Sequence, residues 1–281
     1  MRFLWIGSLV VLLAVSAAEP RFQQTTQEGP RASPELRAVF EHRYSAWTKY
    51  IAPYDGTSST VLLDAWAESG LQSPGFQHIV ELGPEAVPFM VHAIEDNGLL
   101  HPASLLSFAV AKITRKSFGL TPEEMRGHFQ SGDEIATLKR IRQQVLDWWT
   151  SRPQTSALFE SAYGRWKVAK KKGIRVLEIT ERTYDAERNL IMPKATHTDL
   201  GLAYQALREL GIEALPLIAE KVKGGEHDLL PLFAELSDSR GITERGSLPE
   251  RANSTLQWWE KHKHNWLLPS ASAAKLKDPK P

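Results

Sequence analysis

The nine histidines of this 281-residue sequence are the side chains best suited to metal binding or general acid–base catalysis. A catalytic zinc site of the common helical type would need a His-Glu-x-x-His motif, and the sequence contains none. His262 and His264 form the closest pair, near the C-terminus, where they either bind a metal weakly or belong to a solvated helix end. We favour the helix end, and we predict no metal site.

Motifs for nucleophilic catalysis and for phosphate binding are also missing: the sequence has no cysteine, no Gly-x-Ser-x-Gly and no glycine-rich phosphate loop. Two glutamate pairs recur 128 positions apart, Glu81 with Glu209 and Glu85 with Glu213, and recurrent carboxylates would suit general acid–base catalysis. Glu85 and Glu213, however, fall in the expected first turn of a helix, where a negative charge stabilises the helix dipole by about 0.3–1 kcal/mol. We therefore predict no catalytic residue and no cofactor.

The nine tryptophans are the best candidates for non-covalent binding. Trp47 and Trp166 follow the same short motif, and Trp148 and Trp258 each begin a Trp-Trp pair. If these four side chains are exposed, they can stack on sugars or anchor a peptide, whereas their repeated placement favours packing in the core. Neighbouring residues point about 100° apart around a helix, so each Trp-Trp pair is expected to place one ring in the core and one at its rim.

The only basic cluster consists of Lys167 and Lys170–Lys172. It can touch an anionic lipid or glycan, but a lysine run that ends a helix at Gly173 is expected from the helix dipole alone. Without Arg2, which lies in the leader described next, 33 basic residues (34 − 1) face 33 acidic ones. This balance excludes the large basic excess with which nucleic-acid-binding proteins neutralise phosphates.

The first eighteen residues, MRFLWIGSLVVLLAVSAA, have the order of a secretory signal: one positive charge, a short apolar run and small residues before the cleavage site. The apolar run is short for a bilayer-spanning helix, which needs about 20 apolar residues, although an uncleaved anchor stays open. We expect cleavage before Glu19, a periplasmic or secreted protein, and no membrane span after cleavage. Residues 19–33 and 269–281 are polar and rich in proline, serine or lysine, which predicts a disordered linker and a disordered tail.

The sequence repeats itself between these ends. Residues 76–94 align without gaps on residues 204–222, with seven of nineteen positions identical, including the octapeptides ELGPEAVP and ELGIEALP. A motif Phe-Glu-x-x-Tyr-x-x-Trp precedes this region in both copies, and Leu-x-Trp-Trp follows it. We therefore predict two helical modules, 34–152 and 155–268, each with apolar residues spaced three or four apart.

The repeated octapeptide is expected to be a joint between two helices. Gly83 and Gly211 would end one helix in the left-handed conformation, and Pro88 and Pro216 would lie in the first turn of the next. On this interpretation, substitution of either glycine by valine should impair folding similarly. Residues 117–129 and 170–192 give no clear pattern and are left unassigned.

The joint LGPEAVPFM and its second copy LGIEALPLI resemble the HEAT-type α-helical repeat, in which Leu-Gly-x-Glu-Ala-Val/Leu-Pro lies at the turn between packed helices. The residues that carry this resemblance are Leu82, Gly83, Glu85, Ala86, Val87, Pro88 and Met90, and Leu210, Gly211, Glu213, Ala214, Leu215, Pro216 and Ile218. The stretch KITRKSFG followed by Leu-x-Trp-Trp is similar to the end of HEAT-like modules in exported bacterial proteins. The chain has only two such joints, and its aromatic flanks are not general HEAT features. The resemblance implies an all-α fold, a short solenoid with caps of its own.

HEAT-like proteins mostly bind or scaffold, so the resemblance implies a non-enzymatic protein whose partner is another protein or an envelope component, and not nucleic acid. Two alternatives stay open. One is a carbohydrate-binding or envelope-binding module that uses exposed tryptophans. The other is a hydrolase whose carboxylates and histidines converge from distant helices.

Overall fold

The computed structural model describes residues 33–51, 67–128, 134–171, 199–238 and 246–269, which form helices and turns without a β-strand. The predicted all-α class is therefore confirmed. The predicted leader 1–18, nearly all of the linker 19–33 and of the tail 269–281, and residues 172–192 of the unassigned segment lie outside the described residues. Among the described helices, none combines the length and the apolar character needed to cross a bilayer.

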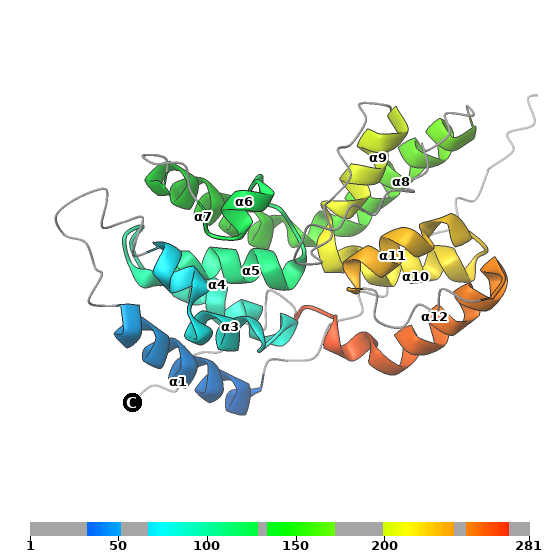
Figure 1. Ribbon diagram of the computed structural model, residues 1–281. Helices are drawn as coiled ribbons and strands as arrows, with labels where there is room; N and C mark the ends of the chain where they lie inside the picture. Colours follow the sequence, from blue (N-terminus) through cyan, green and yellow to red (C-terminus); the bar gives the residue numbers. More distant parts are fainter. Residues whose placement is uncertain (1–32, 52–66, 129–133, 172–198, 239–245, 270–281) are drawn as a thin grey trace, which may run out of the picture.

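The helices lie in two groups that meet near the centre of the molecule (Figure 1). The first group contains α1 (Pro34–Ile51), α3 (Pro74–Val80), α4 (Val87–Asp96), α5 (Leu106–Thr114), α6 (Pro122–Met125) and α7 (Glu134–Ser151). The second group contains α8 (Thr155–Lys171), α9 (Asp199–Arg208), α10 (Leu215–Lys223), α11 (Leu230–Leu236) and α12 (Leu248–His262). One 3-10 turn, Arg152–Gln154, connects the groups at the predicted module boundary.

Helix α1 starts where its sequence predicts. The Ser33 hydroxyl accepts a hydrogen bond from the backbone N–H of Leu36 (3.1 Å), and Pro34 is the first helical residue, where it has no N–H to leave unpaired. Farther along α1, Phe40, Tyr44 and Trp47 form a ladder of rings with centroids 5.6 and 6.1 Å apart. This ladder lies on the side of α1 that packs against α3 and α4.

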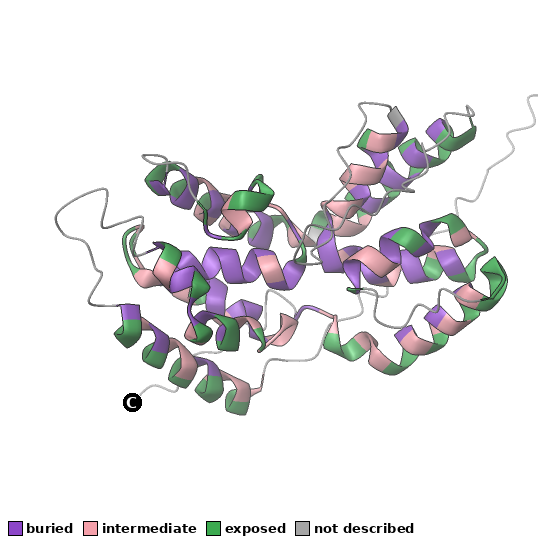
Figure 2. Cartoon of the chain, in the orientation of Figure 1, coloured by how far each residue is buried: buried purple, intermediate pink, exposed green. Residues whose placement is uncertain are grey.

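The centre of the first group is α5, which is buried along nearly its whole length, as Figure 2 shows. Its sequence LSFAVAKIT is mostly apolar, and its small polar residues Ser107 and Thr114 are buried too, so Lys112 is the one charged residue. A helix that is hydrophobic nearly all round needs packing partners all round. Helices α3, α4 and α7 supply them. The C-terminal end of α5 points at the second group, so the residues that follow Thr114 lie between the two groups.

Each repeated octapeptide forms a turn with a glycine at positive φ, followed by a 3-10 turn and a helix with proline in its first turn. Gly83 has φ +73° and precedes the 3-10 turn Pro84–Ala86 and α4; Gly211 has φ +64° and opens the 3-10 turn Gly211–Ala214 before α10. Gly83 differs from its expected left-handed conformation because its ψ is −167°, an extended geometry that only glycine adopts readily at this φ.

Part of the unassigned segment 117–129 is now described. Residues 117–120 form a turn, and Thr121 and Glu124 form a reciprocal capping box at the start of the short helix α6. Of the segment 170–192, only Lys170 and Lys171 are described, as the last residues of α8.

Candidate functional site

The structure places the four candidate tryptophans mainly in the interior. Trp47, Trp148 and Trp166 are buried and pack in the core, so they do not form the exposed surface that binding to a sugar or peptide would require. Trp47 is only 1% exposed, and its indole N–H donates to the carbonyl of Gly70 (3.1 Å). Trp258 is partly exposed, but His262 stacks on its ring and Phe233 meets it edge-on. Its ring is therefore largely used for internal packing.

The two Trp-Trp pairs differ. In the second pair, Trp259 lies in the core and Trp258 at its rim, as the helical geometry predicts. In the first pair, both Trp148 and Trp149 are buried. Trp148 meets Phe118 edge-on, has Lys116 and Arg152 over its ring, and donates its indole N–H to Glu213 of the second group.

His262, Lys167 and Lys170 make contacts that serve the fold. Within the described part of the chain, no group of three or more histidine, aspartate or glutamate side chains is placed to hold a metal ion. The ring Nδ1 of His262 lies 2.8 Å from the carbonyl of Trp258, one turn earlier in α12. Lys167 forms an ion pair with Glu226 (2.7 Å), and Lys170 pairs with Asp228, so both lysines tie α8 to the turn before α11.

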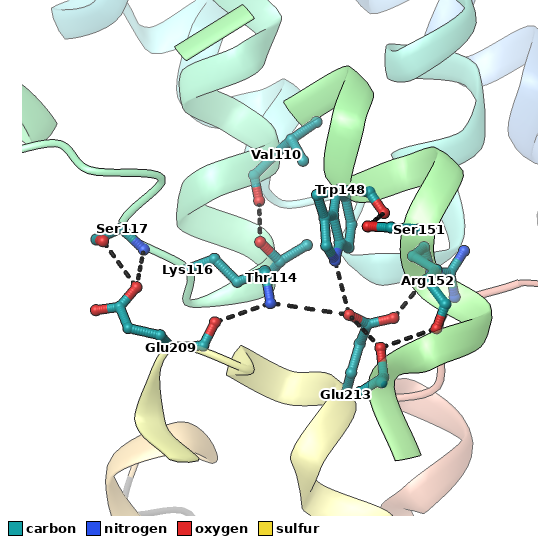
Figure 3. Close-up of polar contacts among 10 residues, drawn as sticks. Val110, Thr114, Lys116, Ser117, Trp148, Ser151, Arg152, Glu209 and Glu213 are labelled. Atoms are coloured by element: carbon teal, nitrogen blue, oxygen red, sulfur yellow. Dashed lines mark hydrogen bonds and ion pairs between the residues drawn. The ribbon is translucent and has the colours of Figure 1, made fainter. Parts of the chain in front are cut away.

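A cluster of charged side chains lies at the junction between the two groups of helices (Figure 3), and we call it the junction cluster. The Glu213 carboxylate is at its centre. One oxygen accepts a hydrogen bond from Arg152 Nε (2.9 Å); the other accepts one from the indole N–H of Trp148 (2.7 Å) and lies 3.9 Å from Lys116 Nζ. Lys116 Nζ also donates to the backbone carbonyl of Glu209 (2.8 Å).

The Glu209 carboxylate completes the junction cluster. It accepts a hydrogen bond from the Ser117 hydroxyl (2.7 Å), so both sides of the turn 209–213 are attached to the segment that follows α5. Arg152 extends the contacts by donating to the carbonyl of Pro269 (2.8 Å), and its guanidinium lies over the ring of Trp149, 4.4 Å from the centroid. Two cations and two carboxylates are thereby brought together, and each cation is more than 50 positions away in the sequence from either carboxylate.

The burial and the hydrogen bonds of the junction cluster suit a structural role better than a role in acid–base catalysis. The side chains of Lys116, Arg152 and Glu213 are only 9–12% exposed. Burial lowers the pKa of Lys116, and the nearby Glu213 and Glu209 carboxylates oppose that shift. Each Glu213 oxygen already accepts a hydrogen bond from the protein. A carboxylate engaged in this way is poorly placed to take a proton from a substrate.

Gly211 explains how closely the two groups approach. A β-carbon at this position would lie 2.2 Å from the backbone carbonyl oxygen of Thr114, at the end of α5. At Gly83, a β-carbon would meet no atom of the described residues within 4 Å. The two glycines therefore have different surroundings, because only Gly211 is pressed against another part of the backbone, and we now expect their substitution to affect folding unequally.

A second buried acidic group lies near the junction, between α9 and α11. Burial raises the pKa of Glu235, while Arg208 and a hydrogen bond from Tyr204 oppose that rise. Arg208 lies 3.7 Å from both the Glu235 and the Glu209 carboxylates. Tyr204 and Glu235 thus form a polar contact inside the second group, which helps to attach α9 to α11.

An open groove of about 390 Å³ lies in the first group of helices, between α1 and α3 and apart from the junction cluster. We call it the α1–α3 groove, and it is lined by His42, Arg43, Ala46, Trp47, Tyr50, Ser73, Pro74, Gly75 and His78. Trp47 forms part of its floor, and Gly75 allows α3 to approach that ring, since a β-carbon there would lie 3.1 Å from Trp47. Arg43 donates to the carbonyl of His78 and so links the two walls.

The sequence analysis predicted neither the junction cluster nor the α1–α3 groove. It identified Glu213 as a recurrent residue but explained it by its interaction with a helix dipole, and no local pattern marks Lys116 or Arg152 as its partners. In the α1–α3 groove, His42 and His78 stand 36 positions apart and have no common motif. Only Trp47 was singled out, and it contributes to the floor and not to an exposed surface.

Comparison of this chain with family models, with curated proteins and with solved structures finds no match.

Proposed function

We propose that this protein is an exported, non-enzymatic helical-repeat protein of HEAT-like type, which binds another protein through the first of its two modules. The proposal has two parts, a duplicated solenoid and a binding surface. The leader-like residues 1–18 support export to the periplasm or the exterior.

The order of elements supports the duplication. In both groups, a long helix with an aromatic ladder is followed by a short helix, a glycine turn, a 3-10 turn, a helix, a second 3-10 turn, a short buried helix and a closing helix with a Trp-Trp pair. The ladder Phe159, Tyr163 and Trp166 has centroid separations of 5.9 Å at both steps, close to those of the ladder in α1. Helix α6 and the helical residues 67–72 have no described counterpart in the second group.

The α1–α3 groove is the single observation that carries the binding function. Its rim holds Tyr50, which is 56% exposed, and the exposed His42 and His78, while its floor is formed by apolar side chains. Protein interfaces commonly combine an apolar centre with aromatic and arginine anchors and a polar rim. The charged groups of the junction cluster, by contrast, are occupied by one another.

A photo-crosslinking experiment on the full chain tests this function. A photoreactive residue replaces Ala46, which is exposed and lines the α1–α3 groove, and in a matched control it replaces the exposed Glu220 on α10. In native envelope preparations, position 46 should capture a defined protein, excess unmodified chain should compete, and position 220 should not capture it. Capture of no protein at position 46, or of the same proteins at both positions, would contradict the proposal.

A further inference from the structure

We propose that the α1–α3 groove takes an acidic, extended peptide segment of the partner protein, with one apolar side chain on the groove floor and carboxylates at Arg43, His42 and His78. This inference rests on the proposed binding function and adds the chemistry of the ligand.

The charge of the groove is the first argument. Its lining contains one permanent cation, Arg43, and the imidazoles of His42 and His78, which can donate N–H hydrogen bonds to a carboxylate. No aspartate or glutamate is among the described residues that line it. Glu41, the acidic neighbour on α1, is held by Arg37 through a 2.8 Å ion pair one turn earlier. A ligand with negative charge is therefore complementary to this surface.

The geometry of Arg43 is the second argument. One terminal nitrogen of its guanidinium donates to the backbone carbonyl of His78, which fixes the side chain across the groove. A guanidinium has five N–H donors, so others stay available to a carboxylate. Because the arginine is already held in place, a carboxylate can bind it with less loss of side-chain entropy than it would at a mobile lysine.

The floor is the third argument, and it distinguishes a peptide from an anionic polysaccharide or a simple anion. Ala46, Pro74 and Gly75 offer apolar surface above the buried ring of Trp47, and the exposed ring of Tyr50 extends it at the end of α1. A volume of about 390 Å³ is within the usual range for small ligand sites. An acidic peptide supplies both the aliphatic side chain that this floor favours and the carboxylates that the rim favours.

The test uses the purified full chain and three probes. The first is an acetylated eight-residue peptide of alternating glutamate and leucine with a fluorophore at its end, and the second is the same peptide with glutamine in place of glutamate. The third is dextran sulfate, an anionic polysaccharide. Binding is measured by fluorescence anisotropy at low and at physiological salt for the peptides, and by competition for dextran sulfate. The glutamate peptide should bind about tenfold more tightly than the glutamine peptide, and added salt should reduce the difference.

Two variants test whether the glutamate peptide binds in the α1–α3 groove. Ala46→Trp fills the groove from the exposed face of α1 and leaves the Arg43 contact intact, while Arg43→Gln removes the fixed charge. Each should weaken binding of the glutamate peptide about tenfold. Lys49→Gln removes one positive charge from the exposed surface of the same helix outside the groove lining, and it should change the affinity less than about twofold. Circular dichroism confirms that each variant is folded.

Three results would overturn the inference: equal binding of the two peptides, no effect of either groove variant, or a strong Ala46→Trp effect on dextran sulfate without binding of the glutamate peptide. The last result would assign the groove to an anionic polysaccharide. If position 46 still captures a protein by crosslinking while the glutamate peptide does not bind, the chemistry inferred for the ligand is wrong and the protein-binding function stands.

Discussion

Residues 81–88 and 209–216 have nearly the same sequence but different surroundings. In the first copy, Glu81 is exposed, Gly83 faces open space and the Glu85 side chain makes no polar contact with the other described residues. In the second copy, Gly211 is pressed against the end of α5, and Glu213 holds Arg152, Trp148 and Lys116 together. A local sequence can therefore specify the shape of a turn without specifying whether that turn is a surface feature or a contact between the two groups of helices.

The same contrast extends into the helices. Phe76 in α3 packs against Trp47 and has the Lys112 ammonium over its ring, whereas Tyr204, at the matching position of α9, donates a hydrogen bond to Glu235. The first group of helices is held mainly by apolar packing. The second group and the junction also depend on buried charges, which stabilise a fold only while their partners are present.

The largest change in stability is expected when the two glycines are replaced by valine. Gly211→Val should destabilise the protein by about 5 kcal/mol, because the side chain adds backbone strain at positive φ and cannot fit beside the Thr114 carbonyl. Gly83→Val should cost about 1–3 kcal/mol, from strain alone. Urea unfolding of both variants checks this difference. Equal destabilisation would mean that the two turns have equivalent surroundings.

The second prediction concerns the recurrent glutamates. Glu213→Ala should destabilise the protein by about 3 kcal/mol, because it leaves Lys116 and Arg152 buried without their central carboxylate. Glu85→Ala is the matched control and should change the stability by less than about 0.5 kcal/mol. Thermal unfolding measures both. A similar loss in the two variants would show that the shared role is the helix dipole and not the junction cluster.

The third prediction concerns how the stability depends on pH through Glu235, in the second group of helices. Burial raises the pKa of Glu235 above the ordinary value of a glutamate, so the folded state binds the proton more tightly than the unfolded state. The stability that this group contributes is fully present below the ordinary glutamate pKa and is lost as the pH rises through the folded-state pKa. Glutamine does not titrate, so the Glu235→Gln variant does not lose this stability as the pH rises.

Urea unfolding of wild type and Glu235→Gln at pH 4 and pH 7 checks the sign. The stability of the variant relative to wild type should increase from pH 4 to pH 7, by less than the effect of Glu213→Ala. A relative stability that falls with pH would contradict the buried position of Glu235.

The smallest effect is expected from a pair of tyrosines in the two ladders. The Tyr44 hydroxyl is buried without a hydrogen-bond partner among the described residues, and burial raises the pKa of Tyr44 to about 12. Tyr44→Phe should therefore leave the stability unchanged or increase it by up to about 1 kcal/mol. Tyr163→Phe should decrease the stability by about 0.5–1 kcal/mol, because the variant lacks the hydroxyl that donates a hydrogen bond to Glu226. Thermal unfolding of the two variants compares them, and a loss of stability in Tyr44→Phe would mean that its hydroxyl does have a partner.

The amino-acid sequence by itself determined the helical class, the start of α1 at Ser33 and Pro34, and the positive φ of Gly83 and Gly211. These features depend on residues within about four positions of one another: the period of apolar side chains, a capping hydroxyl, a proline without an N–H and a glycine without a β-carbon. Local physical chemistry is sufficient for them, so they can be read from short stretches of sequence.

Only the tertiary structure decided which copy of the octapeptide is buried, why Trp148 has no exposed face and where Glu213 finds its cations. Lys116 and Glu213 are 97 positions apart, and His42 and His78 come together from different helices. A buried charge is stable only with partners that the packing of whole helices brings to it, and no local pattern records that packing. The open α1–α3 groove and the closed junction cluster arise in this way in a chain that repeats closely similar sequence motifs.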